Sequence, residues 1–432
     1  MLLGEPQGLC HDRPTPTATD EDNPTVPVFL PFRGLRYRAG GVLDPVTAPP
    51  YDVIDPQQRE ALAARDDHNA VRLILPEGAD PYAGAAALLA AWIEDGTLGP
   101  DGTAAFYVYR MSFTEPDGTP RVTTGVLGAL VLPERIEDGT VLPHERTLPK
   151  AKSDRLDLLR ATRANLDPIW GLCPTPGLTA DLDTATRRPS LAECTDEFGV
   201  HHEVWALEDA GTVAAVSAAV AAGPLVLADG HHRFETALAY RAECAGSDTG
   251  AAAIMCLVVE LADDQLVVHA IHRLVHGLPD DVEARLAATC EVIEAGPHTD
   301  EALADLRVAL RDPARGGIGF VLPDRLLRLV PRADALAAAR ADQPAPLHGV
   351  GAADFDALVR PALEGATLAY RNDAGDCSAI VARGEADAAV LLTPVSVAAI
   401  REAGRAGVRM PEKTTFFWPK PRTGMVMRRL DD

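Results

Sequence analysis

The segment ADGHHRFETAL gathers side chains that can bind phosphate or move protons. An apolar run, typical of a buried strand, stops at Asp229 and Gly230, and a helix-forming run begins just after Arg233. A helix N-terminus offers backbone N–H groups and a partial positive charge, and glycine lets a ligand approach the backbone closely. His231, His232 and Arg233 add side-chain donors at the same place. This turn therefore predicts a phosphate site in which Asp229 holds a metal ion or orients a histidine. In the alternative interpretation, Asp229 only caps the helix while the histidines pack or face solvent.

A second group of charged residues follows another strand-like run, in the segment VLPHERTLPKAKSDRL. Such a loop can place one carboxylate, Glu145, among many cations. That carboxylate can accept a proton from a substrate hydroxyl, while the cations hold anionic groups and neutralise charge in a transition state. The neighbouring charged residues are His144, Arg146, Lys150, Lys152 and Arg155. The alternative interpretation is a solvated charged loop.

Two further places carry weaker signals. Tyr51 and Asp52 in PPYDVI are candidates for the wall of a pocket because two prolines fix the loop, although a turn anchored by a buried tyrosine explains them equally well. Lys413 and Lys420 in PEKTTFFWPK are placed to close over an anion if the C-terminal segment folds back. The histidines of HAIHRLVH are interpreted as core or surface residues rather than as a metal site.

Strands and helices that alternate along the chain must position these residues. Proline and glycine signals predict helices at 56–66 and 80–95, and the β-rich runs on both sides of TEPDGTP predict a hairpin. Further helices are expected in SDRLDLLRATRANL and FETALAYRAECAG, and strands in PIWGLC and PLVLA. A second hairpin is expected in AAAIMCLVVELADDQLVVHAIHRLV, closed by its ADDQ turn. The expected fold class is mixed α/β.

Composition divides the chain into three regions. Residues 1–25 are rich in Pro, Thr and Asp and are expected to form a disordered tail. Residues 26–277 are expected to form the catalytic α/β region. Alanine- and arginine-rich stretches with short strands predict a C-terminal α/β region at 278–432, ending in a basic and aromatic segment.

The charge and apolar content of the chain limit its partners. Its 432 residues include 63 acidic and 40 basic ones, and the net charge of -23 repels phosphate backbones, so nucleic acid is not an expected partner. No apolar run approaches the roughly 18–20 residues that span a membrane, and the N-terminus lacks a signal-peptide pattern. No membrane is expected, and the cytoplasm is the expected location. The seven cysteines form no CxxC pair, and the GxxxxGK[ST], GxSxG and HExxH motifs are absent, so those metal sites and mechanisms are disfavoured.

Five segments in the same order resemble a widespread prokaryotic family of unknown function, DUF1015. These segments are PFRGLRYR, APPYDVI, LPHERTLPK, ADGHHRFETAL and the terminal PEKTTFFWPK. The resemblance extends from about Val26 to the C-terminus.

A more distant resemblance is to the ParB/sulfiredoxin-type superfamily. It is carried by HE, a helix with spaced Arg and Leu, PI before a strand, and DGHHR opening a helix. Within that superfamily, free serine kinases phosphorylate the hydroxyl of free L-serine. The resemblance implies a ParB/sulfiredoxin-like core, matches Glu145 to the catalytic glutamate, and matches Asp229 through Arg233 to the nucleotide-phosphate segment. The stretch at about 174–223 is longer than the connection in those kinases.

The residue chemistry and the resemblance together predict phosphoryl transfer on a small hydroxy amino acid. The expected residues are Glu145, His144, Asp229 and His232 for catalysis; Gly230, His231, Arg233 and Lys150 for phosphate or nucleotide binding; Tyr51, Asp52, Arg146 and Lys413 for the pocket; and Asp229 for metal binding. The resemblance implies Mg²⁺ and a nucleotide, ATP or ADP, as cofactors, and serine or phosphoserine as the small-molecule partner. The alternatives are a phosphoserine phosphatase using the same site and a nucleotide-binding regulatory or ParB-like DNA-associated protein. A homo-oligomer is left open.

Overall fold

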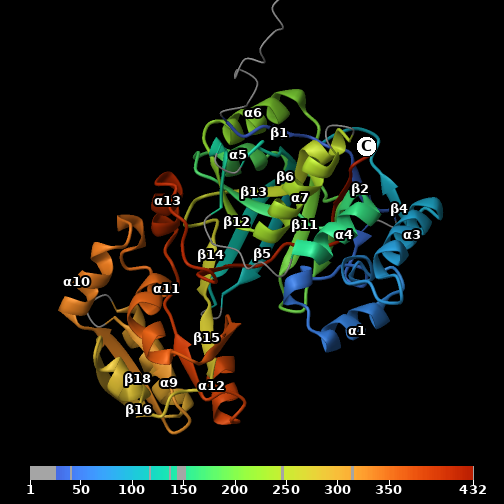
Figure 1. Cartoon of the computed structure of the whole chain (residues 1–432). Coiled ribbons are helices and arrows are strands. Elements are labelled where there is room, and N and C mark those ends of the chain that lie inside the picture. The colour runs from blue at the N-terminus through green and yellow to red at the C-terminus, as the bar shows by residue number, and fades with distance from the viewer. Residues whose placement is uncertain are drawn as a thin grey trace, which may run out of the picture.

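The computed structural model of the chain has two lobes of unequal size (Figure 1). The residues that it describes are 26–38, 41–115, 118–135, 138–143, 152–244, 248–312 and 316–431. The expected tail at 1–25 lies outside these ranges. Each lobe contains helices packed against β-sheets, which confirms the expected mixed α/β fold class. In the part of the chain that is described, every helix is too short or too polar to cross a bilayer.

A mixed sheet forms the centre of the large lobe. In spatial order its described strands are β3 (Gly41–Val42), β10 (Ala192–Thr195), β11 (His201–Leu207), β5 (Phe106–Thr114), β6 (Pro120–Val131), β13 (Ala253–Glu260), β9 (Ile169–Cys173), β12 (Leu225–Asp229) and β7 (Val141–Pro143), and β1 (Phe29–Leu30) also pairs with β6. The pairs β12–β7, β13–β9 and β10–β3 are parallel. The hairpin expected on both sides of TEPDGTP is confirmed as the antiparallel pair β5 and β6.

Alternating side chains of the central strands enter two different cores. Along β9, Ile169 and Cys173 belong to one apolar cluster, whereas Trp170 and Leu172 belong to another. Because successive residues of a strand face opposite sides of the sheet, an apolar residue at every position means that both faces are covered. The first cluster includes Phe234, from the helix that follows the DGHH turn.

Helices of the large lobe begin at the signals that the sequence contains. They are α1 (Pro56–Arg65), α2 (Val71–Ile74), α3 (Pro81–Glu94), α4 (Lys152–Thr162), α5 (Leu178–Leu182), α6 (Ala210–Ala221) and α7 (His231–Cys244). The predictions at 56–66 and 80–95 are confirmed as α1 and α3. In each, an aspartate precedes proline and accepts a backbone N–H: Asp55 from Gln58 at 2.7 Å and Asp80 from Ala83 at 3.3 Å.

The end of the chain returns to the large lobe, where the C-terminus is marked in Figure 1. A second sheet there has the order β4 (Leu98–Pro100), β2 (Gly34–Tyr37), β22 (Met427–Arg429) and β8 (Ala164–Asn165). Because β22 lies between β2 and β8, residues from the two ends of the sequence share one sheet.

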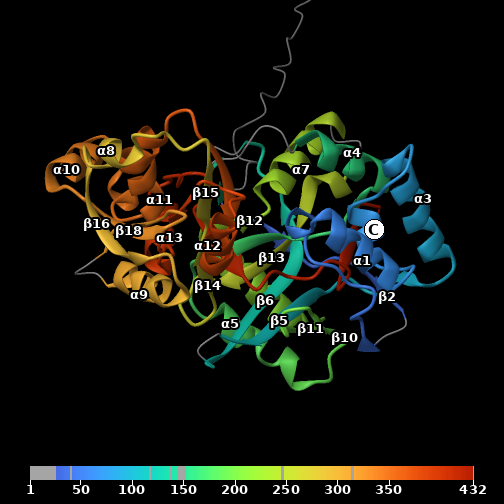
Figure 2. The same cartoon turned by 90° about the horizontal axis from the view of Figure 1, so that it is seen from below.

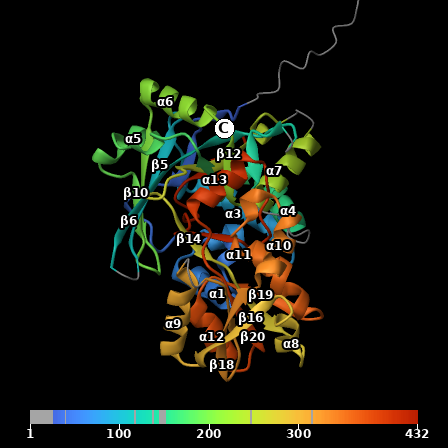
Figure 3. The same ribbon diagram turned by 90° about the vertical axis from the view of Figure 1, so that its left-hand side faces the viewer.

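The small lobe contains the other large sheet, seen beside the large lobe in Figure 2. Its described strands, in spatial order, are β16 (Cys290–Pro297), β18 (Arg325–Pro331), β17 (Ile318–Val321), β20 (Ala388–Leu391), β15 (His272–His276) and β19 (Thr367–Arg371). Its helices are α8 (Val282–Leu286), α9 (Asp300–Arg311), α10 (Ala333–Ala341), α11 (Gly351–Asp354) and α12 (Ala374–Ala382). The next helix, α13 (Val397–Arg405), lies against β12 of the large lobe, as Figure 3 shows. A Cβ added at Gly404 would lie 2.6 Å from Val226, so this contact needs a glycine.

A two-stranded ribbon, β14 (Val267–Ala270) and β21 (Thr415–Trp418), carries the chain between the lobes. The expectation that the ADDQ turn closes a hairpin is therefore wrong. Both edges of β13 are occupied by β6 and β9, so β14 pairs instead with a strand from the end of the chain. The division between 26–277 and 278–432 stays a prediction. The six-stranded sheet begins at His272, and β21 and β22 pair with strands of earlier residues.

Candidate functional site

A cavity of about 570 Å³ between the lobes brings four separate segments together. We call it the cation pocket, because lysine and histidine side chains line it. Its walls come from the η2 turn (Tyr51–Val53), the DGHHR turn, the end of β19, and the C-terminal segment that contains Lys413 and Lys420. The expected pocket residues Tyr51, Asp52 and Lys413 all line this cavity, as does every residue of the DGHHR turn.

The DGHHR turn connects a central strand to a helix, as the sequence predicts. Strand β12 ends at Asp229, and α7 begins at His231, slightly earlier than the expected start after Arg233. The Phe234 N–H donates to the Gly230 carbonyl at 2.9 Å and closes the first helical turn. His231, His232 and Arg233 therefore belong to that first turn, where the partial positive charge of the helix is concentrated.

Asp229 is held between two cations. Its Oδ1 accepts a hydrogen bond from Lys420 Nζ, and its Oδ2 accepts one from Arg233 Nη2 at 3.0 Å. Burial raises the pKa of this carboxyl, but Lys420 and Arg233 outweigh that effect and lower its pKa to about 2. Asp229 is thus ionised at neutral pH and fixes the position of both cations.

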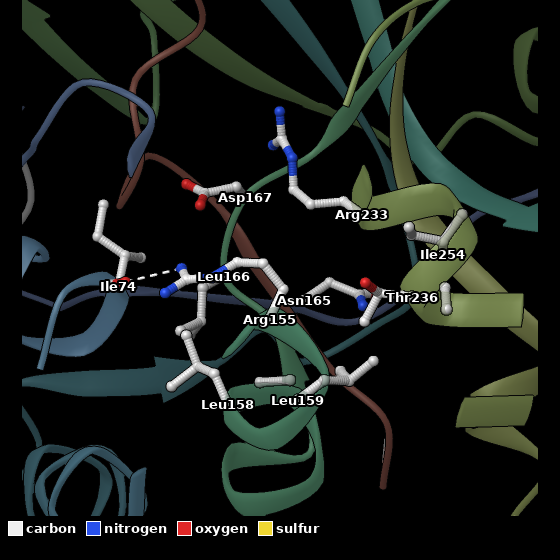
Figure 4. A pocket seen from close by; sticks show the side chains of 12 residues that line it. Ile74, Arg155, Leu158, Leu159, Asn165, Leu166, Asp167, Arg233, Thr236 and Ile254 are labelled. Atoms are coloured by element: carbon white, nitrogen blue, oxygen red, sulfur yellow. Dashed lines mark hydrogen bonds between the residues drawn. The ribbon is translucent and has the colours of Figure 1, made fainter. Parts of the chain in front are cut away.

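A second buried carboxylate, Asp167, lies behind the cation pocket. Figure 4 shows it between the side chains of Arg155 and Arg233. Burial raises the pKa of Asp167. The charge of Arg233, and the hydrogen bond that Thr423 Oγ1 donates to Asp167 Oδ1, oppose that rise. Arg233 is only 12% exposed and also donates to the Pro168 carbonyl, so its guanidinium supports the turn from behind.

The two lysines of the C-terminal segment approach the pocket differently. Lys420 has an 11% exposed side chain, and its ammonium lies 5.1 Å from the centre of the Phe416 ring. Lys413 is exposed and has a φ of 56°, a left-handed conformation that costs a residue with a side chain roughly 1–2 kcal/mol. Strained residues of this kind concentrate at binding sites.

Lysine usage is a signal that sequence reasoning missed. Of the 40 lysine and arginine residues, four are lysine: Lys150, Lys152, Lys413 and Lys420. Lysine and arginine are not interchangeable, since an ammonium is a compact point charge that suits phosphate. Two of the four line the cation pocket, and the other two belong to the segment that contains Glu145.

Other pocket residues were not singled out individually from the sequence, although Glu412, Thr415 and Phe416 lie in the PEKTTFFWPK segment. Residues from the small lobe and the C-terminal segment complete the wall: Ile271, Tyr370, Arg371, Asn372, Glu412, Thr415 and Phe416. Their contribution depends on how the two lobes pack, which no local pattern encodes.

The expected base Glu145 lies outside the described residues, together with His144, Arg146 and Lys150. The described residues on both sides of this segment lie close to the cation pocket. Before it, β7 runs parallel to β12 and ends at the same edge of the sheet as Asp229. After it, α4 packs on α7, and Arg155 of α4 stacks 4.3 Å from the centre of the Tyr51 ring.

The residues around Asp229 do not fit a magnesium ion in this arrangement. Both carboxylate oxygens bind cationic side chains, and an ion would have to displace Lys420. Among the described residues, the group close enough to share a metal is Glu193, His201 and Glu203 on β10 and β11, outside the cation pocket. In this arrangement Asp229 therefore positions Lys420 and Arg233 and is not a metal ligand.

The fold and site define a two-lobed α/β protein with a cavity between its lobes that is lined by basic, histidine and acidic side chains. The chain belongs to the family described as protein of unknown function (DUF1015), whose model matches residues 29–350. No curated protein matches the chain.

Several solved structures share low similarity with this chain. A conserved hypothetical protein from Pyrococcus furiosus is 14% identical, with a TM-score of 0.35, covering 68% of this chain and 93% of that protein. A free serine kinase in complex with AMP is 15% identical, with a TM-score of 0.35, covering 64% of this chain and 83% of the kinase. SbnI with a C-terminal truncation, from Staphylococcus aureus, is 12% identical, with a TM-score of 0.35, covering 69% of this chain and 85% of that truncated chain. The ParB/sulfiredoxin-like core remains a prediction.

Proposed function

We propose that the cation pocket binds a nucleotide, ATP or ADP, and transfers a phosphoryl group to the hydroxyl of a small amino acid, serine being the first to test. One observation carries this proposal: the first turn of α7, Lys413 and Lys420 converge on one cavity of about 570 Å³. Helix N-termini and ammonium groups both bind phosphate in proteins. The carboxylates of Asp52 and Glu412 line the same cavity and suit the ammonium group of a free amino acid.

Each group has a defined task in this proposal. Lys420 and Lys413 neutralise the phosphate oxygens, His231 and the N–H groups at the start of α7 donate hydrogen bonds to them, and Asp229 holds Lys420 in place. A carboxylate, which we assign to Glu145, takes the proton of the acceptor hydroxyl. The hydroxyl oxygen then attacks the terminal phosphorus of the nucleotide, and the rest of the nucleotide leaves. Positioning and charge neutralisation supply most of the rate in such reactions.

The phosphate site is tested with Lys420→Met. Loss of one charge-assisted hydrogen bond costs roughly 1.5–3 kcal/mol, so ATP and ADP should bind about 10- to 100-fold more weakly by isothermal titration calorimetry. Arg405→Met is the matched control. The substitution removes the same charge, and Arg405 is exposed and lies outside the cavity. An unchanged affinity in Lys420→Met would remove the phosphate site from this pocket.

The reaction is tested by following labelled phosphate from ATP or ADP into free serine. The Glu145→Gln variant should keep nucleotide affinity and lose at least about 100-fold in transfer rate, the usual share of a general base. Full activity in that variant would show that another group is the base. Phosphate release from phosphoserine without nucleotide would identify the phosphatase alternative instead.

A further inference from the structure

A second cavity, of about 610 Å³, lies next to the β14–β21 ribbon. Trp418 of β21 and His269 of β14 line it, whereas Phe416 lines the cation pocket. The remaining walls come from both lobes, including Phe198 of the β10–β11 turn and the C-terminal half of α9. Nothing in the proposed phosphoryl transfer uses this cavity, which we call the second pocket.

Two arginines on α9 supply positive charge to the second pocket. Arg307 and Arg311 are one helical turn apart, and neither forms an ion pair with any described residue. Like charges at this spacing repel, and the nearby end of the helix dipole offsets only part of that cost. The two carboxylates of the same wall have other partners: Asp373 accepts the Asp376 N–H at 2.7 Å, and Glu115 pairs with Arg121 at 2.8 Å.

A buried histidine supplies a neutral donor to the same wall. His272 is 7% exposed, and its Nδ1 faces the Leu392 N–H at 3.2 Å. Burial lowers the pKa of His272 to about 4, so the ring is neutral at pH 7 and accepts that N–H through Nδ1. Its proton is therefore on Nε2, which forms no hydrogen bond with any described residue.

The rest of the second pocket is largely apolar. Val267, Leu310, Leu391 and Leu392 contribute aliphatic side chains. An apolar wall beside two guanidinium groups and one N–H donor fits a ligand with an apolar body and one anionic head, since each part meets its complement.

We propose that the second pocket is a binding site for a small carboxylate with an apolar body. The carboxylate lies between Arg307 and Arg311 and accepts the Nε2–H of His272, while its body packs against the leucines. The two pockets share Asn372, so a ligand here contacts the segment that also lines the cation pocket.

The test uses straight-chain carboxylates from propanoate to octanoate and the corresponding amides, titrated against the whole chain by calorimetry. At least one carboxylate should bind saturably, and its amide should bind at least about tenfold more weakly because the charged head is missing. The double variant Arg307→Gln/Arg311→Gln should lose this difference. Its matched control is Arg65→Gln/Arg405→Gln, which removes two exposed arginines outside both cavities and should bind like the parent.

A third variant distinguishes loss of the His272 Nε2–H donor from loss of the folded structure. His272→Asn keeps an acceptor for the Leu392 N–H and removes the donor at Nε2, so it should weaken carboxylate binding while its circular dichroism spectrum stays unchanged. Lys420→Met should bind carboxylates normally, which makes failure here distinguishable from failure of the proposed function. Equal binding of acids and amides, no saturable binding across the series, or parent-like affinity in the arginine double variant would each overturn the proposal.

Discussion

The charges around Asp229 set the pKa of its carboxyl group. The folded protein holds this pKa at about 2, below the usual aspartate value of 3.8, because Lys420 and Arg233 outweigh the effect of burial. A depressed carboxyl pKa contributes stability above the unfolded pKa, and that contribution is lost as pH falls from about 4 toward 2. The shift corresponds to roughly 2 kcal/mol. The Asp229→Asn variant resembles the protonated state of Asp229. In urea unfolding at pH 6, the free energy of unfolding of the parent should therefore exceed that of the variant by roughly this amount, and the difference should shrink toward pH 3. A difference that stays constant over this range would contradict the assigned ion pairs.

At the scale of elements, the β12–α7 turn depends on one glycine. Gly230 has a φ of 83°, and a Cβ there would lie 2.9 Å from Ile169 Cγ2 and 3.1 Å from Ile169 Cα. Gly349 has nearly the same φ, 84°, with nothing within 4 Å of its added Cβ, so it is the matched control. Gly349→Ala should cost roughly 1 kcal/mol for the left-handed backbone alone, and Gly230→Ala roughly 1–3 kcal/mol more for the clash. Chemical denaturation measures both, and nucleotide affinity should fall in Gly230→Ala alone. Equal losses of stability in the two variants would mean that the strand and helix can separate without cost.

The same scale shows where sequence reasoning works and where it fails. The helices α1 and α3 and the β5–β6 hairpin are encoded locally, by caps, prolines and turn residues, and their prediction is confirmed. The ADDQ hairpin is wrong because both edges of β13 pair with strands distant in sequence. Likewise, the DGHHR turn is visible in the sequence, whereas Tyr370 and Glu412 reach the cation pocket only because the lobes pack together.

At the scale of the whole molecule, strand β22 links the C-terminal segment to the first half of the chain. Strand β22 lies between β2 and β8, and Arg428 on it is 7% exposed. The Arg428 guanidinium donates to Asn165 Oδ1 at 3.0 Å and to the carbonyls of Ala253 and Gly250 at 2.9 and 3.0 Å. Burial lowers the pKa of Arg428 to about 10, which reflects how far it is removed from water.

Arg428→Met should therefore destabilise the whole large lobe, including the turn that lines the cation pocket. It removes charge-assisted hydrogen bonds from three acceptors, although Asn165 Oδ1 keeps the Met255 N–H and the Gly250 carbonyl keeps the Ala253 N–H. A hydrogen bond made by a charged donor is typically worth roughly 1.5–3 kcal/mol. That is a large share of the roughly 5–15 kcal/mol by which domains are stable, so the melting temperature should fall by several degrees and nucleotide affinity should fall with it. Arg405→Met, an exposed arginine with the same substitution, should melt like the parent. If both variants melted at the same temperature, β22 would contribute nothing measurable to the stability of the large lobe. The anchoring of β22 would then not explain how Lys413 and Lys420, which precede it, are held at the cation pocket.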